Sequence, residues 1–237
     1  ATVAHVRKLL GAARPVAGSL LVLPEMFATG FSMNVAETAE TPLGESIRKL
    51  ARDFSCAVLA GTTGCDAAGR GLNVALAYAP DGRPLCSYTK LHPFSFGTET
   101  RHFAAGTDLT CFTWSGLRIT PLICYDLRFP EAFRAAIRVH RPQLFCVLAN
   151  WPAQRRAHWN ALLPARAIEN QAYVAGVNRT GAAPGVSYRG DSRILSFQGT
   201  DLARAGGEET LLSAELDSAG VEAWRNEFPA LDDMRAI

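Results

Sequence analysis

The chain has 237 residues, of which 48% are hydrophobic and 19% are charged, so it is long and apolar enough to bury a substantial core. Its formal net charge is +2 and the basic residues are scattered, which argues against a nucleic acid or an anionic membrane as the partner and favours a small molecule. The sequence has no apolar run of transmembrane length and no signal-peptide pattern at its N-terminus, which predicts a soluble cytoplasmic protein.

The cysteines are spread along the chain without the spacing of a zinc or redox motif. The sequence contains no CxxC and no Cys/His ligand pattern, so it predicts neither a disulfide framework nor a metal site. We expect a reducing compartment and no cofactor. The six residues are Cys56, Cys65, Cys86, Cys111, Cys124 and Cys146.

The chain begins with a helical pattern followed by a strand. Residues 1–13 carry apolar side chains at helical spacing, and residues 19–23 form a short apolar run typical of a buried parallel strand. Glu25 follows this strand at its carboxyl end, where open α/β sheets place their ligands. The alternative for Glu25 is a solvated acid in a loop.

The next segments predict a surface helix and a second strand. Thr41 is suited to cap a helix over residues 42–54, and Pro42 is suited to its first position. Residues 57–61 are apolar and predict the following strand.

A hairpin then leads to a lysine. Residues 72–79 and 85–88 are strand-like and flank Pro80-Asp81-Gly82, a turn signal in which glycine supplies a positive φ. Lys90 follows the second strand in an aromatic setting, although a surface lysine with its stem over those rings is the alternative. Residues 95–106 lack periodicity and predict a loop that could cover a pocket.

The central stretch, residues 119–133, predicts a strand, a sharp turn and a helix. The apolar run ends at Cys124, and Pro130 opens the helical pattern. A thiol at such a turn lies near unpaired backbone N–H groups, which favour a thiolate and can receive an oxyanion. The alternative is a buried core cysteine, because free cysteines are among the most buried residues.

The pattern of helix and strand continues after this stretch. We expect a helix over residues 130–140, a buried strand over 144–149, a helix over 155–170 that is kinked or restarted at Pro164, and a strand over 173–177. Residues 181–190 are glycine-rich and predict a turn region. The last predicted elements are strands over 192–197 and 211–216 and a helix over 218–228.

This alternation predicts an α/β protein with either two sheets or one mixed sheet covered by helices. The sequence has no linker that would divide the chain, so we expect one domain over residues 1–237. Three strand ends in succession carry Glu25, Lys90 and Cys124. A carboxylate base, an ammonium group and a thiol are what amide hydrolysis through a covalent intermediate requires.

These residues and the segments around them resemble the nitrilase or carbon–nitrogen hydrolase superfamily. The family's glutamate, lysine and cysteine match Glu25 in LVLPEMF, Lys90 in YTKLHPF and Cys124 in LICYDLRFPE. The segments LANWP, ARAIENQAYVAGVNR and YRGDSR extend the resemblance through nearly the whole chain. Within the superfamily the sequence is most similar to the bacterial ω-amidases, which implies an amide of a short 2-oxo-dicarboxylic acid as substrate.

The resemblance also implies roles for individual residues. Cys124 would be the nucleophile, Glu25 the general base, and Lys90 with the Tyr125 backbone N–H the oxyanion donors. Glu99 would position the lysine or the substrate, and Arg128 would pair with the substrate carboxylate through its planar guanidinium group. Trp151, Phe27 and Phe31, together with Tyr125, would line the pocket.

The family fold is an αββα four-layer sandwich that dimerises through its helices, so we expect a homodimer or a higher homo-oligomer. Family members have a strand before the first helix, and we expect this sequence to lack that N-terminal strand. Two alternative functions stay open. One is another amidase of the superfamily, acting on deaminated glutathione or an N-carbamoyl amino acid, and the other is a non-catalytic binding protein that retains the pocket.

Overall fold

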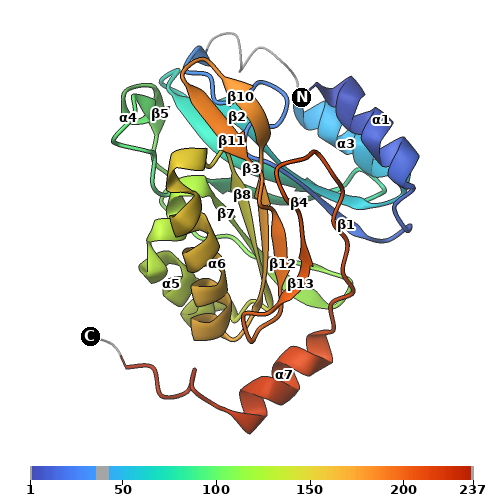
Figure 1. The fold of residues 1–237 in the computed structure, drawn as a ribbon, viewed down its shortest axis with the longest axis vertical. Helices are drawn as coiled ribbons and strands as arrows, with labels where there is room; N and C mark the ends of the chain where they lie inside the picture. The colour runs from blue at the N-terminus through green and yellow to red at the C-terminus, as the bar shows by residue number, and fades with distance from the viewer. Residues whose placement is uncertain (1, 36–42, 236–237) are drawn as a thin grey trace.

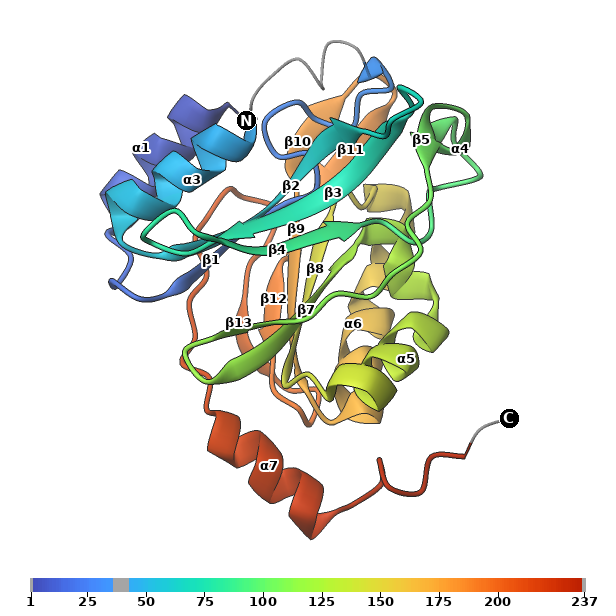
Figure 2. The ribbon, with the colours of Figure 1, turned by 180° about the vertical axis from the view of Figure 1, so that it is seen from behind.

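The fold is an αββα sandwich in which two β-sheets pack face to face and helices cover the outer face of each (Figure 1). The computed structural model describes residues 2–35 and 43–235. Helices α1 (Val3–Ala13) and α3 (Leu43–Phe54) lie on the outer face of the first sheet, and α5 (Pro130–His140) and α6 (Arg156–Asn170) lie on the outer face of the second, as the view from behind also shows (Figure 2). The expected layer architecture is confirmed.

The first half of the chain forms the first helical layer and the first sheet. The sheet has the order β1-β2-β3-β4, with β5 paired to β3. β1 runs parallel to β2, and β2, β3 and β4 follow one another antiparallel. The elements are α1 (Val3–Ala13), β1 (Leu20–Leu23), α3 (Leu43–Phe54), β2 (Ala57–Cys65), β3 (Gly71–Tyr78), β4 (Pro84–Thr89), α4 (Glu99–His102) and β5 (Phe103–Ala104).

Successive residues of β2 explain why this sheet is covered on both faces. Val58 and Ala60 pack in an apolar cluster with α1 and α3, whereas Leu59 packs in a second cluster with the other sheet. Side chains alternate between the two faces of a strand, so a strand that is apolar at every position needs a partner layer on each side. The continuous apolar run of β2 therefore specifies an inner layer of the sandwich.

The second half of the chain forms the second sheet, in the order β13-β12-β9-β8-β7-β6. Its centre is parallel, since β7, β8 and β9 pair in parallel. The elements are β6 (Phe112–Trp114), β7 (Leu117–Ile123), the 3₁₀ helix η1 (Cys124–Arg128), α5 (Pro130–His140), β8 (Leu144–Ala149), the 3₁₀ helix η2 (Ala153–Arg155), α6 (Arg156–Asn170), β9 (Tyr173–Asn178), the hairpin β10 (Thr180–Ala183) and β11 (Val186–Arg189), β12 (Arg193–Leu195), β13 (Asp201–Arg204) and α7 (Ser218–Glu227).

Helix α6 continues through Pro164, so the structure does not start a new helix there. A proline has no N–H and leaves the carbonyl four residues earlier without its usual donor. Here Arg193 Nη1 donates to that carbonyl, Asn160 O, at 3.1 Å. Packing of Trp159 and Leu163 in the core also holds the helix on the sheet. An outside donor and core packing therefore compensate for the proline.

Two late predictions were wrong. Residues 181–190, expected to be a turn region, contain most of the β10–β11 hairpin, whose turn includes Gly185 at a φ of 74°. Residues 211–216, expected to be a strand, form no strand, and β13 pairs with the edge of β12 that faces away from β9. Strand pairing depends on which segment reaches the free edge of β12, which local apolar pattern does not determine. The predicted cap Thr41 and the helix start at Pro42 lie outside the described residues.

Candidate active site

Glu25 lies at the carboxyl end of β1, where the chain turns sharply against β2. The Gly61 N–H donates to the Pro24 carbonyl at 3.2 Å, and the Phe27 N–H donates back to the Gly61 carbonyl at 3.1 Å. Met26 has a φ of 43°, which places the turn in the left-handed region. These contacts fix the backbone on both sides of Glu25, whose side chain is fully buried.

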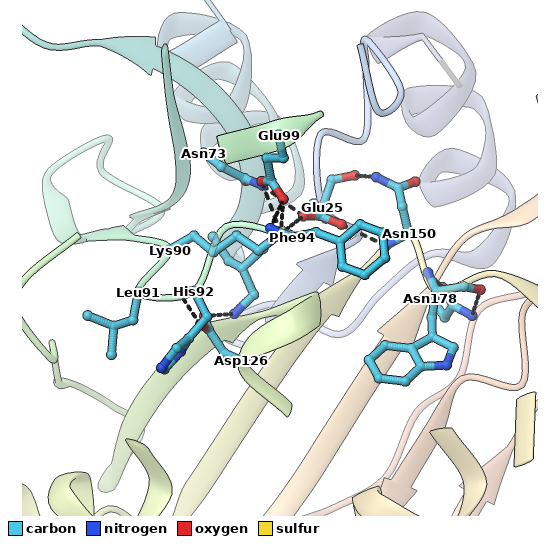
Figure 3. Close-up of polar contacts among 12 residues, drawn as sticks. Glu25, Asn73, Lys90, Leu91, His92, Phe94, Glu99, Asp126, Asn150 and Asn178 are labelled. Atoms are coloured by element: carbon cyan, nitrogen blue, oxygen red, sulfur yellow. Dashed lines mark hydrogen bonds and ion pairs between the residues drawn. The ribbon is translucent and has the colours of Figure 1, made fainter. Parts of the chain in front are cut away.

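The Glu25 carboxylate meets Lys90 and Glu99 in a buried ion-paired cluster (Figure 3). Lys90 Nζ donates to Glu25 Oε1 at 2.9 Å and to the two oxygens of Glu99 at 3.1 and 2.9 Å. Asn73 Nδ2 donates to Glu25 Oε1 at 2.7 Å and to Glu99 Oε1 at 2.9 Å. The predicted Glu25, Lys90 and Glu99 therefore converge, and Asn73 joins the two carboxylates.

The charge of Lys90 is stabilised by this cluster. Burial alone would lower the pKa of Lys90, but the nearby Glu25 and Glu99 carboxylates raise it above its ordinary value. The side chain is 1% exposed and holds a full positive charge at neutral pH because of these partners. A buried ammonium group of this kind can stabilise negative charge that develops next to it.

Cys124 lies at the carboxyl end of β7, at the first position of η1. Its φ of 46° is in the left-handed region, which L-residues rarely occupy and which is often found at functional sites. The start of a helical turn leaves N–H groups without intrahelical acceptors, and Tyr125, the second residue of η1, carries one such group. The expected strand, sharp turn and helix around the thiol are confirmed.

Asp126 holds this turn in place. Its Oδ2 accepts from the Ile123 N–H at 2.9 Å and from the Tyr88 hydroxyl at 2.7 Å. Its Oδ1 accepts from the His92 N–H at 2.9 Å and contacts His92 Nδ1 at 2.8 Å. Asp126 is fully buried, so it ties the Cys124 turn on the second sheet to the Lys90 segment on the first.

The charges of Glu25 and Lys90 act on the Cys124 thiol. Burial raises the pKa of the Cys124 thiol, the Glu25 carboxylate raises it further, and Lys90 opposes both by favouring the thiolate. The pKa lies above that of an ordinary cysteine, so the resting group is a thiol at neutral pH. A thiol in this state can act as a nucleophile only if a base removes its proton.

Asn150, at the end of β8, connects this thiol with the Glu25 carboxylate. Its backbone N–H donates to Glu25 Oε2 at 2.9 Å and also faces the Cys124 sulfur, whose pKa it lowers. Its side-chain Nδ2 donates to the Glu25 carbonyl at 2.9 Å. Asn150 thus fixes Glu25 at both its backbone and its carboxylate.

Cys124 opens into a cavity of about 140 Å³. The predicted Phe31, Tyr125, Arg128 and Trp151 all line it together with Lys90. The remaining lining residues are Phe94, Asn150, Pro152, Arg155, Val186 and Tyr188.

Arg128 lies against the aromatic wall of this cavity. Its guanidinium carbon is 4.8 Å from the centre of the Trp151 ring and 5.9 Å from that of Tyr125, and its Nη2 is 3.0 Å from His158 Nδ1. Burial lowers the pKa of Arg128, which nevertheless stays charged at neutral pH because arginine starts so high. The cavity therefore joins a thiol, an ammonium group and a guanidinium group.

Phe27 does not belong to this cavity, contrary to the sequence-based expectation. It is 5% exposed and packs with residues of α1 and α3 on the outer side of the first sheet. The left-handed turn at Met26 reverses the chain after Glu25 and directs Phe27 into that core.

Several contributors to the site, among them Asn73, Tyr188 and Arg155, were not singled out from the sequence. Asn73 interrupts the apolar run of β3 while being 1% exposed, and a buried amide of this kind needs hydrogen-bond partners, which was an available signal. Tyr188 lies in strand β11, where a turn region was expected, and Arg155 ends the short 3₁₀ helix η2, so local pattern gave no orientation for either side chain. Among the described residues no group of His, Cys, Asp and Glu side chains is placed to hold a metal ion. Over the same residues no helix is long and apolar enough to cross a membrane.

Comparison with known proteins agrees with this geometry. The family model described as carbon-nitrogen hydrolase matches residues 1–226. The omega-amidase YafV of Escherichia coli (strain K12) is 41% identical over 217 residues, which cover 90% of this chain and 83% of that protein. The 2-oxoglutaramate amidase of Bacillus subtilis (strain 168) is 35% identical over 221 residues, covering 91% and 85%.

A solved structure is also similar along the full chain. It is a CN-hydrolase superfamily protein from Xanthomonas campestris, with a TM-score of 0.90 and 35% identity, covering 100% of this chain and 93% of that one. The family match and these relatives show that the chain belongs to the carbon–nitrogen hydrolase family of the nitrilase superfamily and is a hydrolase of carbon–nitrogen bonds other than peptide bonds.

Proposed function

We propose that this amidase hydrolyses the ω-amide of a short 2-oxo-dicarboxylic acid monoamide, such as 2-oxoglutaramate, to the diacid and ammonia. The observation that carries the proposal is the cavity that joins Cys124 and the ion-paired Lys90 with the Arg128 guanidinium. The ω-amidase and 2-oxoglutaramate amidase relatives support the same substrate class.

In the first half of the reaction, Cys124 Sγ attacks the amide carbon while the Glu25 carboxylate accepts the thiol proton. The carbonyl oxygen becomes an oxyanion between Lys90 and the Tyr125 N–H. Lys90 donates to Glu25 and to both oxygens of Glu99, and because its two contacts with the Glu99 carboxylate can share one N–H, another N–H is left for this purpose. Loss of one such donor costs about 3–4 kcal/mol of transition-state stabilisation. Collapse of the intermediate breaks the C–N bond, and Glu25 returns the proton to the departing ammonia.

In the second half, water hydrolyses the resulting thioester. Glu25 takes a proton from the water molecule, whose oxygen attacks the thioester carbon, and the same two donors hold the second oxyanion. Cleavage of the C–S bond releases the carboxylate product, and the thiol regains its proton. Glu25 can serve both steps because Asn73, Lys90 and the Asn150 N–H hold its carboxylate in one orientation.

Arg128 supports an anionic substrate. Its guanidinium group forms no ion pair with a carboxylate of the described residues, and it faces the cavity over Trp151. A planar guanidinium suits a carboxylate through paired N–H donors.

Steady-state kinetics test the substrate. We expect kcat/KM to be higher for 2-oxoglutaramate than for deaminated glutathione or an N-carbamoyl amino acid. A protein with no preference for 2-oxoglutaramate would not be an ω-amidase.

Mass spectrometry of the intact protein after substrate addition tests the chemistry. We expect a thioester adduct on Cys124, and neither adduct nor turnover in Cys124→Ala. The matched control is Cys65→Ser, which removes an exposed thiol away from the cavity and should leave both unchanged. Binding without adduct or turnover in the unaltered protein would instead indicate a binding protein.

We also infer a homodimer or higher homo-oligomer in a reducing, cytoplasmic setting. Val139 on α5 and Ile168 on α6 are 70% and 57% exposed on the outer helical layer, which supports contact with a second copy. All six thiols are free, as a reducing compartment would keep them. Light scattering coupled to gel filtration would give the oligomeric state, and Val139→Glu should shift an oligomer toward the monomer.

A further inference from the structure

Arg155 places a second guanidinium group at the cavity. It is the last residue of η2, which follows the end of β8, and its carbonyl accepts from Trp151 Nε1 at 2.8 Å. Its guanidinium carbon is 5.2 Å from the centre of the Phe94 ring. The Trp151 side chain, which lines the cavity, is therefore hydrogen-bonded to the Arg155 backbone, and the Arg155 guanidinium group packs against the Phe94 ring.

The two cavity arginines differ from their neighbours in lacking an anionic partner. In the same region Arg156 pairs with Asp191 at 2.5 Å and Arg193 pairs with Asp201 at 2.6 Å. Over residues 2–35 and 43–235, neither Arg128 nor Arg155 forms an ion pair with a carboxylate. The proximity of Arg155 also adds to burial in lowering the pKa of Arg128, so the two cations repel each other. A bound anion would relieve this repulsion.

We propose that Arg155 is a specificity-determining residue that, together with Arg128, binds the carboxylate and the adjacent 2-oxo group of the substrate. This inference rests on the proposed function and adds a second residue to the recognition of that substrate. A 2-oxo acid presents only hydrogen-bond acceptors at this end, and two guanidinium groups present only donors. An α-amino acid amide such as glutamine would instead bring its ammonium group against two fixed positive charges. The arginine pair therefore selects 2-oxo acids and rejects 2-amino acids.

A binding assay that needs no turnover tests the pair directly. The ligands are 2-oxopentanoate and 2-aminopentanoate, which differ only at the second carbon and carry no amide. Their binding is followed as protection of Cys124 from alkylation by iodoacetamide, with the modified peptide identified by mass spectrometry. In the unaltered protein we expect 2-oxopentanoate to protect at a concentration about tenfold or more below that of 2-aminopentanoate.

Arg155→Gln should weaken protection by 2-oxopentanoate about 10- to 100-fold, the range for loss of a charge-assisted hydrogen bond, and should narrow its advantage over 2-aminopentanoate. In turnover, KM for 2-oxoglutaramate should rise while kcat and the rate on neutral butanamide change by less than about threefold, because Arg155 contacts no reacting atom. The control is Arg204→Gln, which removes an equal charge from an exposed position on β13 outside the cavity. Arg204→Gln should leave the protecting concentrations of both ligands, KM, kcat and the rate on butanamide unchanged.

Equal protection of the unaltered protein and Arg155→Gln by 2-oxopentanoate would overturn the inference. An equal loss of turnover on 2-oxoglutaramate and butanamide would also overturn it, since that would show a structural role. Failure of the proposed function has a different outcome. In that case 2-oxoglutaramate would not be hydrolysed, yet 2-oxopentanoate would still protect Cys124 in a manner that depends on Arg155.

Discussion

Glu25 lies so close to Gly61 that no side chain fits between the two backbones. A Cβ atom at Gly61 would be 2.5 Å from the Glu25 Cα and 2.8 Å from the Pro24 carbonyl oxygen. Both neighbours are backbone atoms of the turn that presents the carboxylate, so they cannot move aside without moving Glu25. The position of the proposed base therefore depends on a glycine in the adjacent strand β2.

Gly61→Ala should consequently impair both folding and catalysis. Overpacking of this kind costs about 1–3 kcal/mol of unfolding free energy, and we expect kcat to fall by about tenfold or more as Glu25 shifts. Urea unfolding and steady-state kinetics measure the two effects. Gly64→Ala, in the same strand, is the control because its added Cβ would have no heavy atom within 4 Å. If Gly61→Ala and Gly64→Ala had the same unfolding free energy and the same kcat, the close packing of Gly61 against the Glu25 backbone would be unimportant.

Local pattern was sufficient to predict several elements, including those that precede Glu25 and Cys124. The helix over residues 130–140 and the strand over 144–149 coincide with α5 and β8, and the strand expected over 19–23 differs from β1 by one residue. Glu25 and Cys124 each follow a short apolar run, and such runs become parallel strands whose carboxyl ends meet at one edge of the layers. The residue types at those ends then indicated the chemistry before any distance was known.

Contacts between distant segments could not be predicted in this way. Asn73 is 48 residues from Glu25 in the sequence and Asn150 is 125 residues from it, yet both donate hydrogen bonds to its carboxylate. No local periodicity encodes such pairings. Phe27 was misplaced because its direction depends on the left-handed conformation of Met26, a residue type that rarely adopts it. The orientation of Arg155 likewise depends on how η2 packs against Phe94.

Lys90 combines a structural and a proposed catalytic role, and a pair of variants separates them. Lys90→Met leaves two buried carboxylates without their cation, so we expect a loss of about 3–5 kcal/mol in unfolding free energy. Adding Glu99→Gln restores the net charge of the cluster and should recover much of that stability. Turnover should stay about 10²- to 10³-fold below the unaltered enzyme, because the oxyanion donor is still missing.

Urea unfolding gives the free energy of unfolding of the single and the double variant, and steady-state kinetics give their kcat. If the double variant regained activity together with stability, the lysine would be needed only to hold the fold.

Arg128→Ala should affect substrates according to their charge. Loss of a charge-assisted contact should lower kcat/KM for carboxylated amides by roughly 10- to 100-fold. Neutral butanamide should change by less than about threefold, since it has no group for the guanidinium to bind. Arg204→Ala on the exposed edge strand β13 serves as the matched control. Equal losses for both substrate classes would show that Arg128 only supports Trp151 and Tyr125.

Glu25→Gln should make Cys124 more acidic while abolishing turnover. Burial and then the Glu25 charge raise the pKa of the thiol, so removing that charge lowers the pKa and exposes a thiolate at lower pH. The pH dependence of iodoacetamide alkylation at Cys124, followed by peptide mapping, should shift downward in the variant.

The exposed Cys65 provides an internal control, because its alkylation profile should be the same in both proteins. An unchanged or upward-shifted profile at Cys124 would mean that Glu25 does not act on the thiol. A downward shift with retained turnover would mean that another group takes the proton. Only a lower pKa combined with lost activity fits a carboxylate that destabilises the resting thiolate and serves as the base during attack.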